Sequence, residues 1–380
     1  MTMSLAPVIA NTTMCSGWSE SSRRSADELK QYDQVETVLI TIVMPCILIT
    51  GLVCNSGFIY VVLRVSWMQN IPNKYLCHLA VADIILLVNA IGEKISHYWL
   101  SPYVYDEASS GVFGCIVVQV WKFIGYYASI LFVSLVAFER YIAVCRPLEK
   151  FGNNRRFVQI IAMAWIASAF LACLQIPSSC NVTIYCIMWS PTDLEANPDL
   201  PESIGYCLPA NEIQNLEDFA VLIQTMTFIA ALVCNAVLYF KIIRELNKRM
   251  ASIGVAAAAS SRQPSVRSND SDQTLKDAHI RDRVARMLII NGTVFFLLTS
   301  PYQVIMLVMA VANEDALEEE KNFGTWMQIC RILTYINSVV NPVIYGVTNA
   351  RYRKAFRKAF YCQCPGNRAS VSVIHPSEGK

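Results

Sequence analysis

Long apolar segments alternate with shorter polar segments along most of the chain. Seven apolar segments approach or exceed the roughly 20 residues that a helix needs to cross the hydrocarbon core of a membrane. They cover residues 38–63, 75–100, 113–136, 158–176, 219–240, 287–312 and 323–347. Lengths near 20, rather than alternating segments near ten, favour helices over a transmembrane barrel. The pattern predicts an all-α membrane protein built as a seven-transmembrane helix bundle.

The composition supports a membrane protein. Hydrophobic residues make up 54% of the 380 residues, and charged residues only 16%, whereas soluble domains carry about 25% charged residues. The formal net charge is +2, so the chain has no strong basic excess to attract a nucleic acid. We therefore expect no nucleic-acid partner.

Lysine and arginine are concentrated in one set of connecting segments. The segments near 64–74, 146–157 and 241–286, with Arg140 and the tail from 350, hold about 24 of the 31 basic residues. The opposite face holds about 7 basic and 20 acidic residues, and basic residues mark the cytoplasmic side. We expect a multi-pass plasma-membrane protein with its N-terminus outside and its C-terminus inside.

This orientation divides the chain into an outer terminus, a bundle and inner segments. The expected parts are an extracellular glycosylated N-terminus (1–34), the bundle (35–347), a flexible third cytoplasmic loop within it (248–276), a cytoplasmic amphipathic eighth helix (348–361) and a tail (362–380). The eighth helix alternates bases with aromatic residues at helical spacing, which is typical of a helix lying on membrane lipid.

Two kinds of covalent modification are expected on the two faces. Asn11 and Asn181 begin glycosylation triplets on the predicted outer face. Cys362 and Cys364 directly follow the basic, aromatic eighth helix, a placement that suits palmitoylation. The alternative for these two cysteines is a pair of inert free thiols.

Polar residues inside the apolar segments form one candidate cation site. The residues are Asp83, Ser129, Asn337, Ser338 and Asn341. One carboxylate surrounded by hydroxyl and amide oxygens suits a hard cation such as sodium. A hydrogen-bonded network around a protonated aspartate explains the same residues equally well, so an allosteric sodium ion and a plain polar network stay open. No other cofactor is indicated.

Several motifs occur in order along these segments. They are GLVCN ending at Asn55, LAVAD ending at Asp83, Cys115 at the third segment, ERY at 139–141 followed by PL at 147–148, Trp165 in the fourth, and NPVIY at 341–345. In combination they resemble the rhodopsin-like (class A) G-protein-coupled receptors, over about residues 35–364. Two positions depart from the family pattern: Thr299 stands where a tryptophan is usual, and Ala231 where a proline is usual.

The resemblance implies a heterotrimeric G protein as partner, with arrestin and receptor kinases. It assigns activation and coupling to Glu139, Arg140, Tyr141, Leu148, Tyr239, Phe295, Pro301, Asn341, Pro342 and Tyr345. Pro301 and Pro342 each remove a backbone hydrogen bond and bend their helix, which provides a joint for a two-state movement.

The resemblance also implies a disulfide between Cys115 and a cysteine of the second outer loop. Cys207 lies about 24 residues before Ala231, a separation usual for the family. Cys115–Cys207 is therefore favoured over Cys115–Cys186. The pairing of Cys15, Cys180 and Cys186 stays open, and one option is a Cys180–Cys186 bond around the loop.

The expected ligand cavity lies between the outer halves of the helices. Its candidate residues are Glu93, Gln119, Lys122, Phe123, Tyr126, Tyr302, Gln303, Arg331 and Tyr335. Amine receptors of the family have an aspartate where this chain has Lys122, so an amine ligand is not expected. Either Lys122 and Arg331 hold an anionic ligand group, or Glu93 satisfies one of them and the pair is structural.

The outer segments favour a peptide ligand. The second outer loop is long enough for a hairpin lid, and the sequence NEDALEEE at 313–320 makes the rim acidic, which attracts basic groups. Taken as a whole, the sequence resembles the neuropeptide-receptor branch of the family. A receptor for a lipid or small anionic ligand is the alternative, and a membrane transporter is a third reading. The scattered histidines and the absence of HExxH and GxSxG motifs argue against an enzyme.

Overall fold

The computed structural model describes residues 19, 23–25, 31–104, 106, 111–146, 154–190, 200–209, 215–260, 269–311 and 323–360. For residues 23–25, 215, 217, 250, 252–260, 269–281, 311 and 323 it describes only the backbone.

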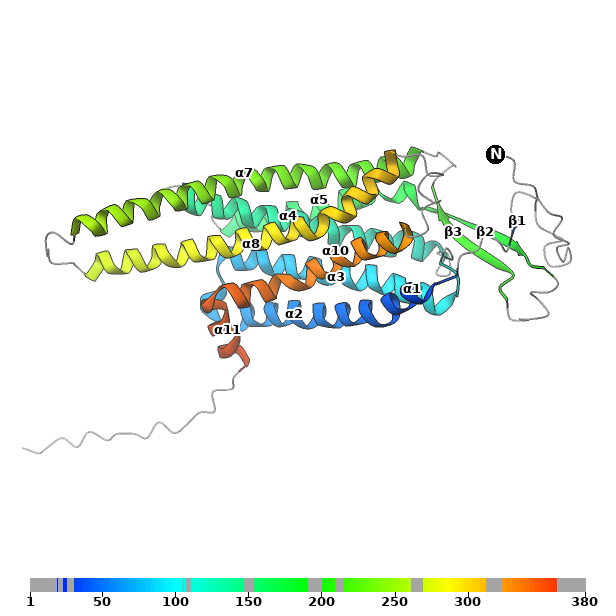
Figure 1. Ribbon diagram of the computed structural model, residues 1–380, viewed down its shortest axis with the longest axis horizontal. Coiled ribbons are helices and arrows are strands. Elements are labelled where there is room, and N and C mark those ends of the chain that lie inside the picture. Colours follow the sequence, from blue (N-terminus) through cyan, green and yellow to red (C-terminus); the bar gives the residue numbers. More distant parts are fainter. Residues whose placement is uncertain are drawn as a thin grey trace, which may run out of the picture.

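The described chain forms a bundle of roughly parallel and antiparallel helices with a small sheet at one end (Figure 1). The first span comprises α1 (Gln34–Val38), a π-helical turn (Leu39–Val43) and α2 (Met44–Arg64). The other spans are α3 (Ile71–Leu100), a π-helical turn (Phe113–Val118) leading into α4 (Gln119–Cys145), α5 (Asn154–Cys173), α7 (Asn215–Ser260), α8 (Asn269–Val311) and α10 (Phe323–Thr348).

Within the described residues, six of these spans are long and apolar enough to cross a membrane by themselves. The seventh, α10, is 26 residues long but carries several polar residues. It packs against α2, α3 and α8, so its polar side chains face protein rather than lipid. The predicted seven-helix architecture is confirmed.

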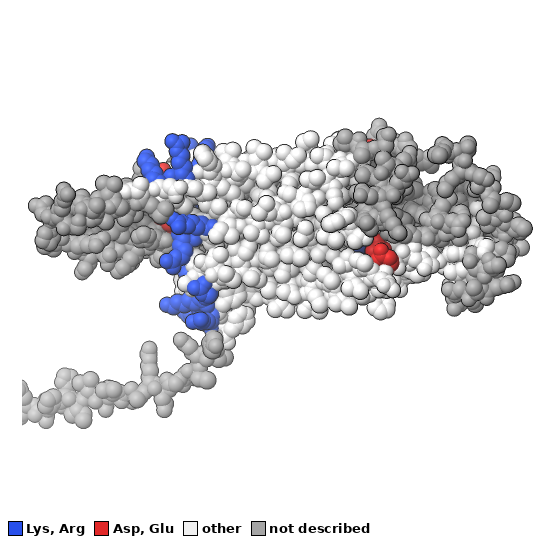
Figure 2. All heavy atoms as spheres, in the orientation of Figure 1, with Lys and Arg blue, Asp and Glu red and all other residues white. Residues whose placement is uncertain are grey.

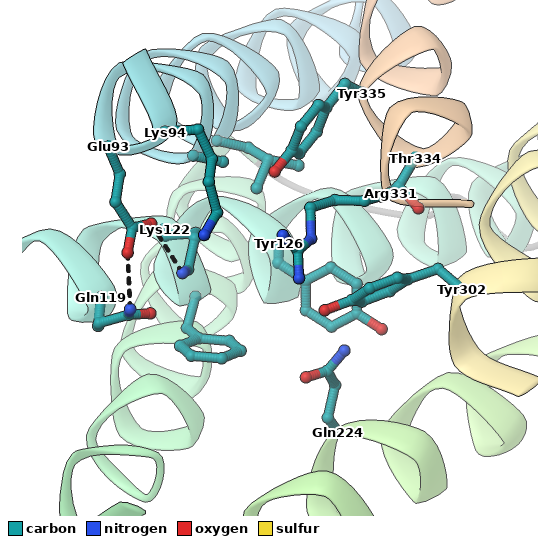
Figure 3. A pocket seen from close by; sticks show the side chains of 13 residues that line it. Glu93, Lys94, Gln119, Lys122, Tyr126, Gln224, Tyr302, Arg331, Thr334 and Tyr335 are labelled. Atoms are coloured by element: carbon teal, nitrogen blue, oxygen red, sulfur yellow. Dashed lines mark hydrogen bonds and ion pairs between the residues drawn. The ribbon is translucent and has the colours of Figure 1, made fainter. Parts of the chain in front are cut away.

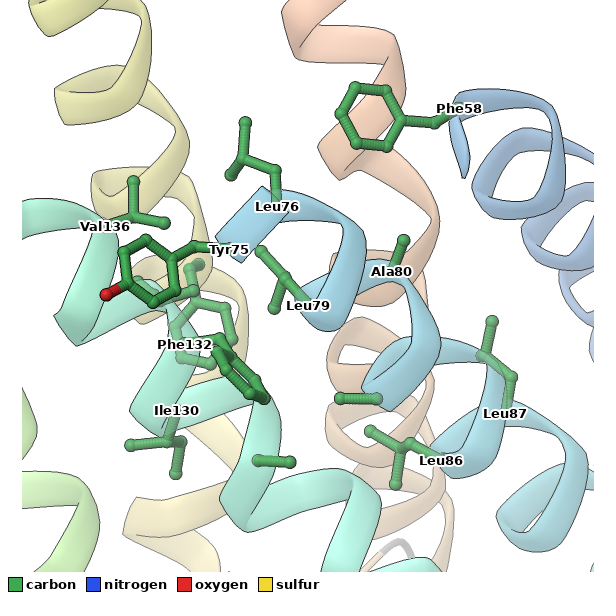
Figure 4. Packing of buried hydrophobic residues seen from close by; sticks show 14 of the residues in the cluster. Phe58, Tyr75, Leu76, Leu79, Ala80, Leu86, Leu87, Ile130, Phe132 and Val136 are labelled. Carbon is green, nitrogen blue, oxygen red and sulfur yellow. The ribbon is translucent and has the colours of Figure 1, made fainter. Parts of the chain in front are cut away.

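The core of the bundle is built around α3 and α4. In each, 56% of the most apolar window is buried, against 17–22% in the other four apolar spans. Figure 4 shows Tyr75 and Leu79 of α3 lying near Phe132 and Val136 of α4, with Phe58 reaching in from α2. Helices α3 and α4 therefore lie at the centre of the bundle, where their side chains contact one another. The more exposed outer helices face lipid.

A three-stranded sheet caps one end of the bundle, which we call the sheet end (Figure 1). Strands β2 (Asn181–Met188) and β3 (Ser203–Leu208) form an antiparallel hairpin. Strand β1 (Arg23–Ser25) runs parallel to β2. The predicted hairpin in the second outer loop is confirmed, and the added strand from the N-terminal region was not foreseen.

The Cys115–Cys207 disulfide is present and joins the start of the third span to β3. The option of a Cys180–Cys186 bond is wrong, because Cys180 is a free thiol and Cys186 takes part in another disulfide. Cys186 lies in β2 and Cys180 just before it. Six residues of extended chain span about 20 Å, whereas bonded cysteines need Cα atoms about 4.4–6.8 Å apart.

The opposite end of the bundle carries α11 (Ala350–Phe360), and we call it the α11 end. This helix is the predicted amphipathic eighth helix. A loop was expected over 248–276, but α7 continues to Ser260 and α8 begins at Asn269. The run of alanines at 256–259 explains the extension of α7, since alanine is the strongest helix former.

Charge separates along the long axis of the molecule. In Figure 2, lysine and arginine form a band at the α11 end, and a broad belt without charged residues covers the middle of the visible face. An uncharged belt bounded by a basic band is the surface expected of a protein embedded in a bilayer.

Candidate functional site

A cavity of about 240 Å³ lies among the spans, toward the sheet end. Thirteen residues line it: Leu86, Ala90, Glu93, Lys94, Gln119, Lys122, Phe123, Tyr126, Gln224, Tyr302, Arg331, Thr334 and Tyr335. Those on α4 repeat at intervals of three and four residues, which places them on one helix face. The lining is mostly polar or aromatic, so the cavity offers hydrogen-bond partners on several sides.

Glu93 on α3 is the centre of a cluster with two α4 residues (Figure 3). One carboxylate oxygen accepts a hydrogen bond from Gln119 at 2.8 Å. The other forms an ion pair with the Lys122 ammonium at 2.9 Å. Each carboxylate oxygen thus has its own donor, and the two helices are tied together at the depth of the cavity.

Arg331 on α10 enters the cavity from the other side (Figure 3). Its guanidinium contacts Gln328 at 3.3 Å and lies 5.9 Å from the centre of the Tyr302 ring. Among the described residues, no carboxylate comes within ion-pair distance of it. Arg331 therefore presents a charge to the cavity that the described protein does not neutralise by contact.

Replacing Lys122 alone with methionine should destabilise the fold, because the largely buried Glu93 carboxylate loses its ion-pair partner and keeps the hydrogen bond from Gln119. Losing one partner of a fully buried pair costs about 3 kcal/mol or more, and because the Lys122 side chain is 23% exposed the expected loss here is smaller, about 1–2 kcal/mol. The double variant E93Q/K122M should recover most of the loss, since neither charge remains. Thermal unfolding in detergent measures both variants; equal stability of K122M and the unmodified protein would contradict a structural pair.

A second polar cluster lies deeper in the bundle, around Asp83. Its carboxylate is fully buried and accepts hydrogen bonds from Ser129 at 2.8 Å and from Asn341 at 2.7 Å. Asn337 and Ser338 are buried on the same α10 segment. Carboxylate, hydroxyl and amide oxygens form a donor set that suits sodium, and the observed hydrogen bonds equally satisfy the aspartate by themselves.

The motif asparagine of the first span also joins this region. Asn55 donates to the backbone oxygens of Gly51 at 3.0 Å and Ser338 at 2.9 Å. The first span and α10 are thus joined through a backbone carbonyl beside the Asp83 cluster. Trp165 of α5 similarly donates to His78 of α3 at 3.3 Å.

At the α11 end, Glu139 and Arg140 of α4 form an ion pair at 2.5 Å, with Arg140 buried. Tyr141 follows, with Arg146 and Lys241 near its ring. The pair is therefore closed in this conformation. Leu148, the predicted contact for a partner, lies outside the described residues.

The remaining predicted activation residues lie on α7, α8 and α10. Tyr345 of α10 is buried against Phe58 and Tyr352. Tyr239 of α7 is buried with its hydroxyl against the backbone of α8 at Gly292. Phe295 packs on Phe296, and Pro301 and Pro342 lie inside α8 and α10.

With this geometry in place, the comparison with known families is decisive. The sequence profile of the 7 transmembrane receptor (rhodopsin family) matches residues 54–345. The chain belongs to this family. It is therefore a multi-pass membrane protein and a G-protein-coupled receptor, and it is not an enzyme.

Individual relatives of this receptor share its length but little of its sequence. The thyrotropin-releasing hormone receptor of Bos taurus is 28% identical over 91% of this chain and 85% of its own. Bombesin receptor subtype-3 of Ovis aries is 23% identical, over 94% and 82%. A crystal structure of squid rhodopsin aligns with a TM-score of 0.67 at 19% identity, over 88% of this chain and 83% of that one, which shows the shared fold.

The structure brings together most of the predicted ligand residues of the receptor. Gln303 is the exception, because it is buried in α8 without lining the cavity. Lys94, Gln224 and Thr334 line the cavity and were missed. Thr334 follows Arg331 by three residues, so helical spacing was a usable signal for it. Gln224 gave no such signal, because the fifth span was interpreted by hydrophobicity alone.

Proposed function

We propose that this receptor binds an extracellular peptide in the cavity between α3, α4, α7, α8 and α10. The sheet end lies outside the cell and the α11 end inside, in the plasma membrane. The basic band at the α11 end supports this orientation. Exposed Asn181 at the start of β2 is then an available glycosylation site; Asn11, Cys362 and Cys364 lie outside the described residues.

The proposal rests on Arg331, which contacts no carboxylate among the described residues. Its guanidinium lies in a cavity that tyrosine and glutamine side chains also line. Peptides supply carbonyl and carboxylate oxygens for a guanidinium, together with amide groups for the other walls. Because the cavity is only about 240 Å³, smaller than the roughly 300–1,000 Å³ of sites that enclose a drug-sized ligand, it receives the end of a peptide. The remainder lies across the mouth, beneath the β2–β3 hairpin.

The relatives support the same ligand class. They are named as receptors for thyrotropin-releasing hormone, bombesin, galanin and somatostatin, which are receptors of the peptide type. At 22–28% identity these names support a class of ligand rather than one hormone.

A lipid or small anionic ligand is the second candidate, and the positive charge of Arg331 and Lys122 favours it. The cavity walls weigh against a long acyl chain, because Glu93, Lys94, Gln119 and Gln224 all line the space. Burying a hydrocarbon chain there would desolvate these groups without replacing their hydrogen bonds.

Signalling proceeds through the α11 end. Agonist binding shifts a two-state equilibrium in which α8 swings outward around Pro301 and Arg140 leaves Glu139 to receive a heterotrimeric G protein. Arrestin and receptor kinases use the same opened face, and Asp83, Ser129 and Asn341 would supply the oxygen ligands of an allosteric sodium ion. An R140A receptor should bind agonist but drive little nucleotide exchange; full exchange by that variant would contradict this role.

An agonist screen tests the proposed ligand class. Cells expressing the receptor are exposed to matched peptide, lipid and small-anion libraries, with calcium and cyclic AMP as readouts and untransfected cells as control. Responses confined to peptides are expected. Responses confined to lipids or small anions would replace the proposal with the second candidate.

A further inference from the structure

An apolar groove of about 430 Å³ lies on the outside of the receptor, where α2, α10 and α11 meet. It is separate from the ligand cavity and shares no residue with it. The residues that line it are Cys54, Pro342, Val343, Gly346, Val347, Arg353, Phe356 and Arg357. Its position faces the surroundings of the bundle rather than its interior.

The wall formed by α10 is a stripe of small and aliphatic residues. Val343 is 48% exposed and Val347 is 71% exposed, although both belong to a helix whose other face is buried. Gly346 stands between them, and a side chain built there would meet nothing within 4 Å. The missing side chain leaves room along the groove, and the exposed valines offer apolar contact to whatever fills it.

Two arginines at one edge are the charged residues of the groove lining. Arg353 and Arg357 are exposed and lie four residues apart on α11, so they project from the same helix face. Arg353 donates to the backbone oxygens of Gly346 at 3.1 Å and Val347 at 2.8 Å, both through one nitrogen. That contact holds its guanidinium beside the groove, with other N–H groups still available.

The groove thus combines apolar space with two arginines of α11. It lies at the α11 end, where the basic band borders the uncharged belt (Figure 2). We propose that it binds one anionic phospholipid. An acyl chain lies along Val343, Gly346 and Val347, and the lipid phosphate contacts Arg353 and Arg357. Arginine forks match phosphate oxygens, and an acyl chain that fits the groove gains close packing contacts with the exposed valines.

Native mass spectrometry of the purified full-length receptor tests the proposal with two probes. Dioleoyl phosphatidylserine and dioleoyl phosphatidylcholine have identical chains and differ in headgroup charge. Retention of phosphatidylserine over phosphatidylcholine is expected. The variant R353Q/R357Q should weaken phosphatidylserine binding about 10- to 30-fold, since each base near an anionic headgroup contributes roughly one factor of five.

A matched control variant on the same helix distinguishes a specific lipid site from general electrostatic attraction between α11 and anionic lipid. K354Q/K358Q removes the same charge from α11, but neither lysine lines the groove. It should keep nearly full binding, and equal losses in the two double variants would overturn the proposal. If R353Q/R357Q does not fold, R357Q alone makes the same comparison with K358Q, because Arg357 makes no contact with the α10 carbonyls that bind Arg353.

Two further variants distinguish other occupants. G346L fills the open space without changing charge, and it should abolish the retention of both lipids. In C362A/C364A, which cannot carry its own acyl chains at these positions, binding should be unchanged. Lipid binding that appears only in C362A/C364A would assign the groove to the receptor's own acyl chain. Displacement of phosphatidylserine by equimolar chain-free glycerophosphoserine would assign it to a free anion; either result overturns the proposal.

Discussion

Replacing Arg331 with glutamine is expected to lower the potency of a peptide agonist about 10- to 100-fold while surface expression holds. A hydrogen bond to a charged group contributes about 1.5–3 kcal/mol, and each 1.4 kcal/mol is a factor of ten. The fold should tolerate the change, because among the described residues no carboxylate would lose its partner. The concentration for half-maximal calcium release, corrected for surface receptor, measures the effect.

The control variant for this prediction is R331K. It keeps the positive charge but replaces the planar fork with a single ammonium, so its potency should fall between the unmodified receptor and R331Q. A peptide pair with a free or amidated C-terminus adds a double-mutant cycle. If the peptide carboxylate contacts Arg331, amidation lowers potency on the unmodified receptor and has little effect on R331Q. Unchanged potency of R331Q for every agonist would remove Arg331 from the binding site.

A single methyl group at Gly125 is expected to destabilise the receptor clearly more than the same change at Gly92. Gly125 lies on α4 where that helix packs directly against the backbone of α3. A Cβ atom there would lie 2.6 Å from the backbone nitrogen of Leu86 and 2.9 Å from the backbone oxygen of Ala82. Backbone atoms cannot rotate away as a side chain does, so the two central helices must separate.

If α3 and α4 move apart, the side chains of the core lose packing contacts and the fold becomes less stable. Overpacking of a close contact costs typically 1–3 kcal/mol and sometimes more, so G125A should unfold at a clearly lower temperature and G125V should scarcely reach the cell surface. The matched control is G92A on α3, where an added Cβ meets nothing within 4 Å. Unfolding temperatures in detergent compare the two, and equal stability of G125A and G92A would contradict this packing.

Hydrophobic periodicity predicted the spans well because the bilayer imposes a length on every helix that crosses it. Even α10, whose polar residues lower its mean hydropathy, was found from its length and its NPVIY motif. Helix ends were less predictable. The solvent-side extensions of α7 and α8 cross no membrane, so the length rule does not apply to them.

Part of the candidate site was predictable from helical spacing. Spacing of three and four residues identified Gln119, Lys122, Phe123 and Tyr126 as one face of α4. Gln303 was predicted together with Tyr302, although adjacent residues of a helix do not share a face, and it is buried in α8 without lining the cavity.

The sequence by itself determined that this chain is a seven-helix membrane receptor of the rhodopsin family, and the resemblance to that family implied the bond between Cys115 and Cys207. These features follow from large and local terms: the cost of exposing a peptide backbone or a charge to lipid, and the spacing of motif residues. Only the tertiary structure decided that Glu93 pairs with Lys122 and that Arg331 faces the cavity. It also decided that Gly125 allows the backbones of α3 and α4 to approach closely. Such choices depend on the directions of side chains from separate helices, where alternatives differ by only a few kcal/mol and sequence spacing within one helix carries no information about the next.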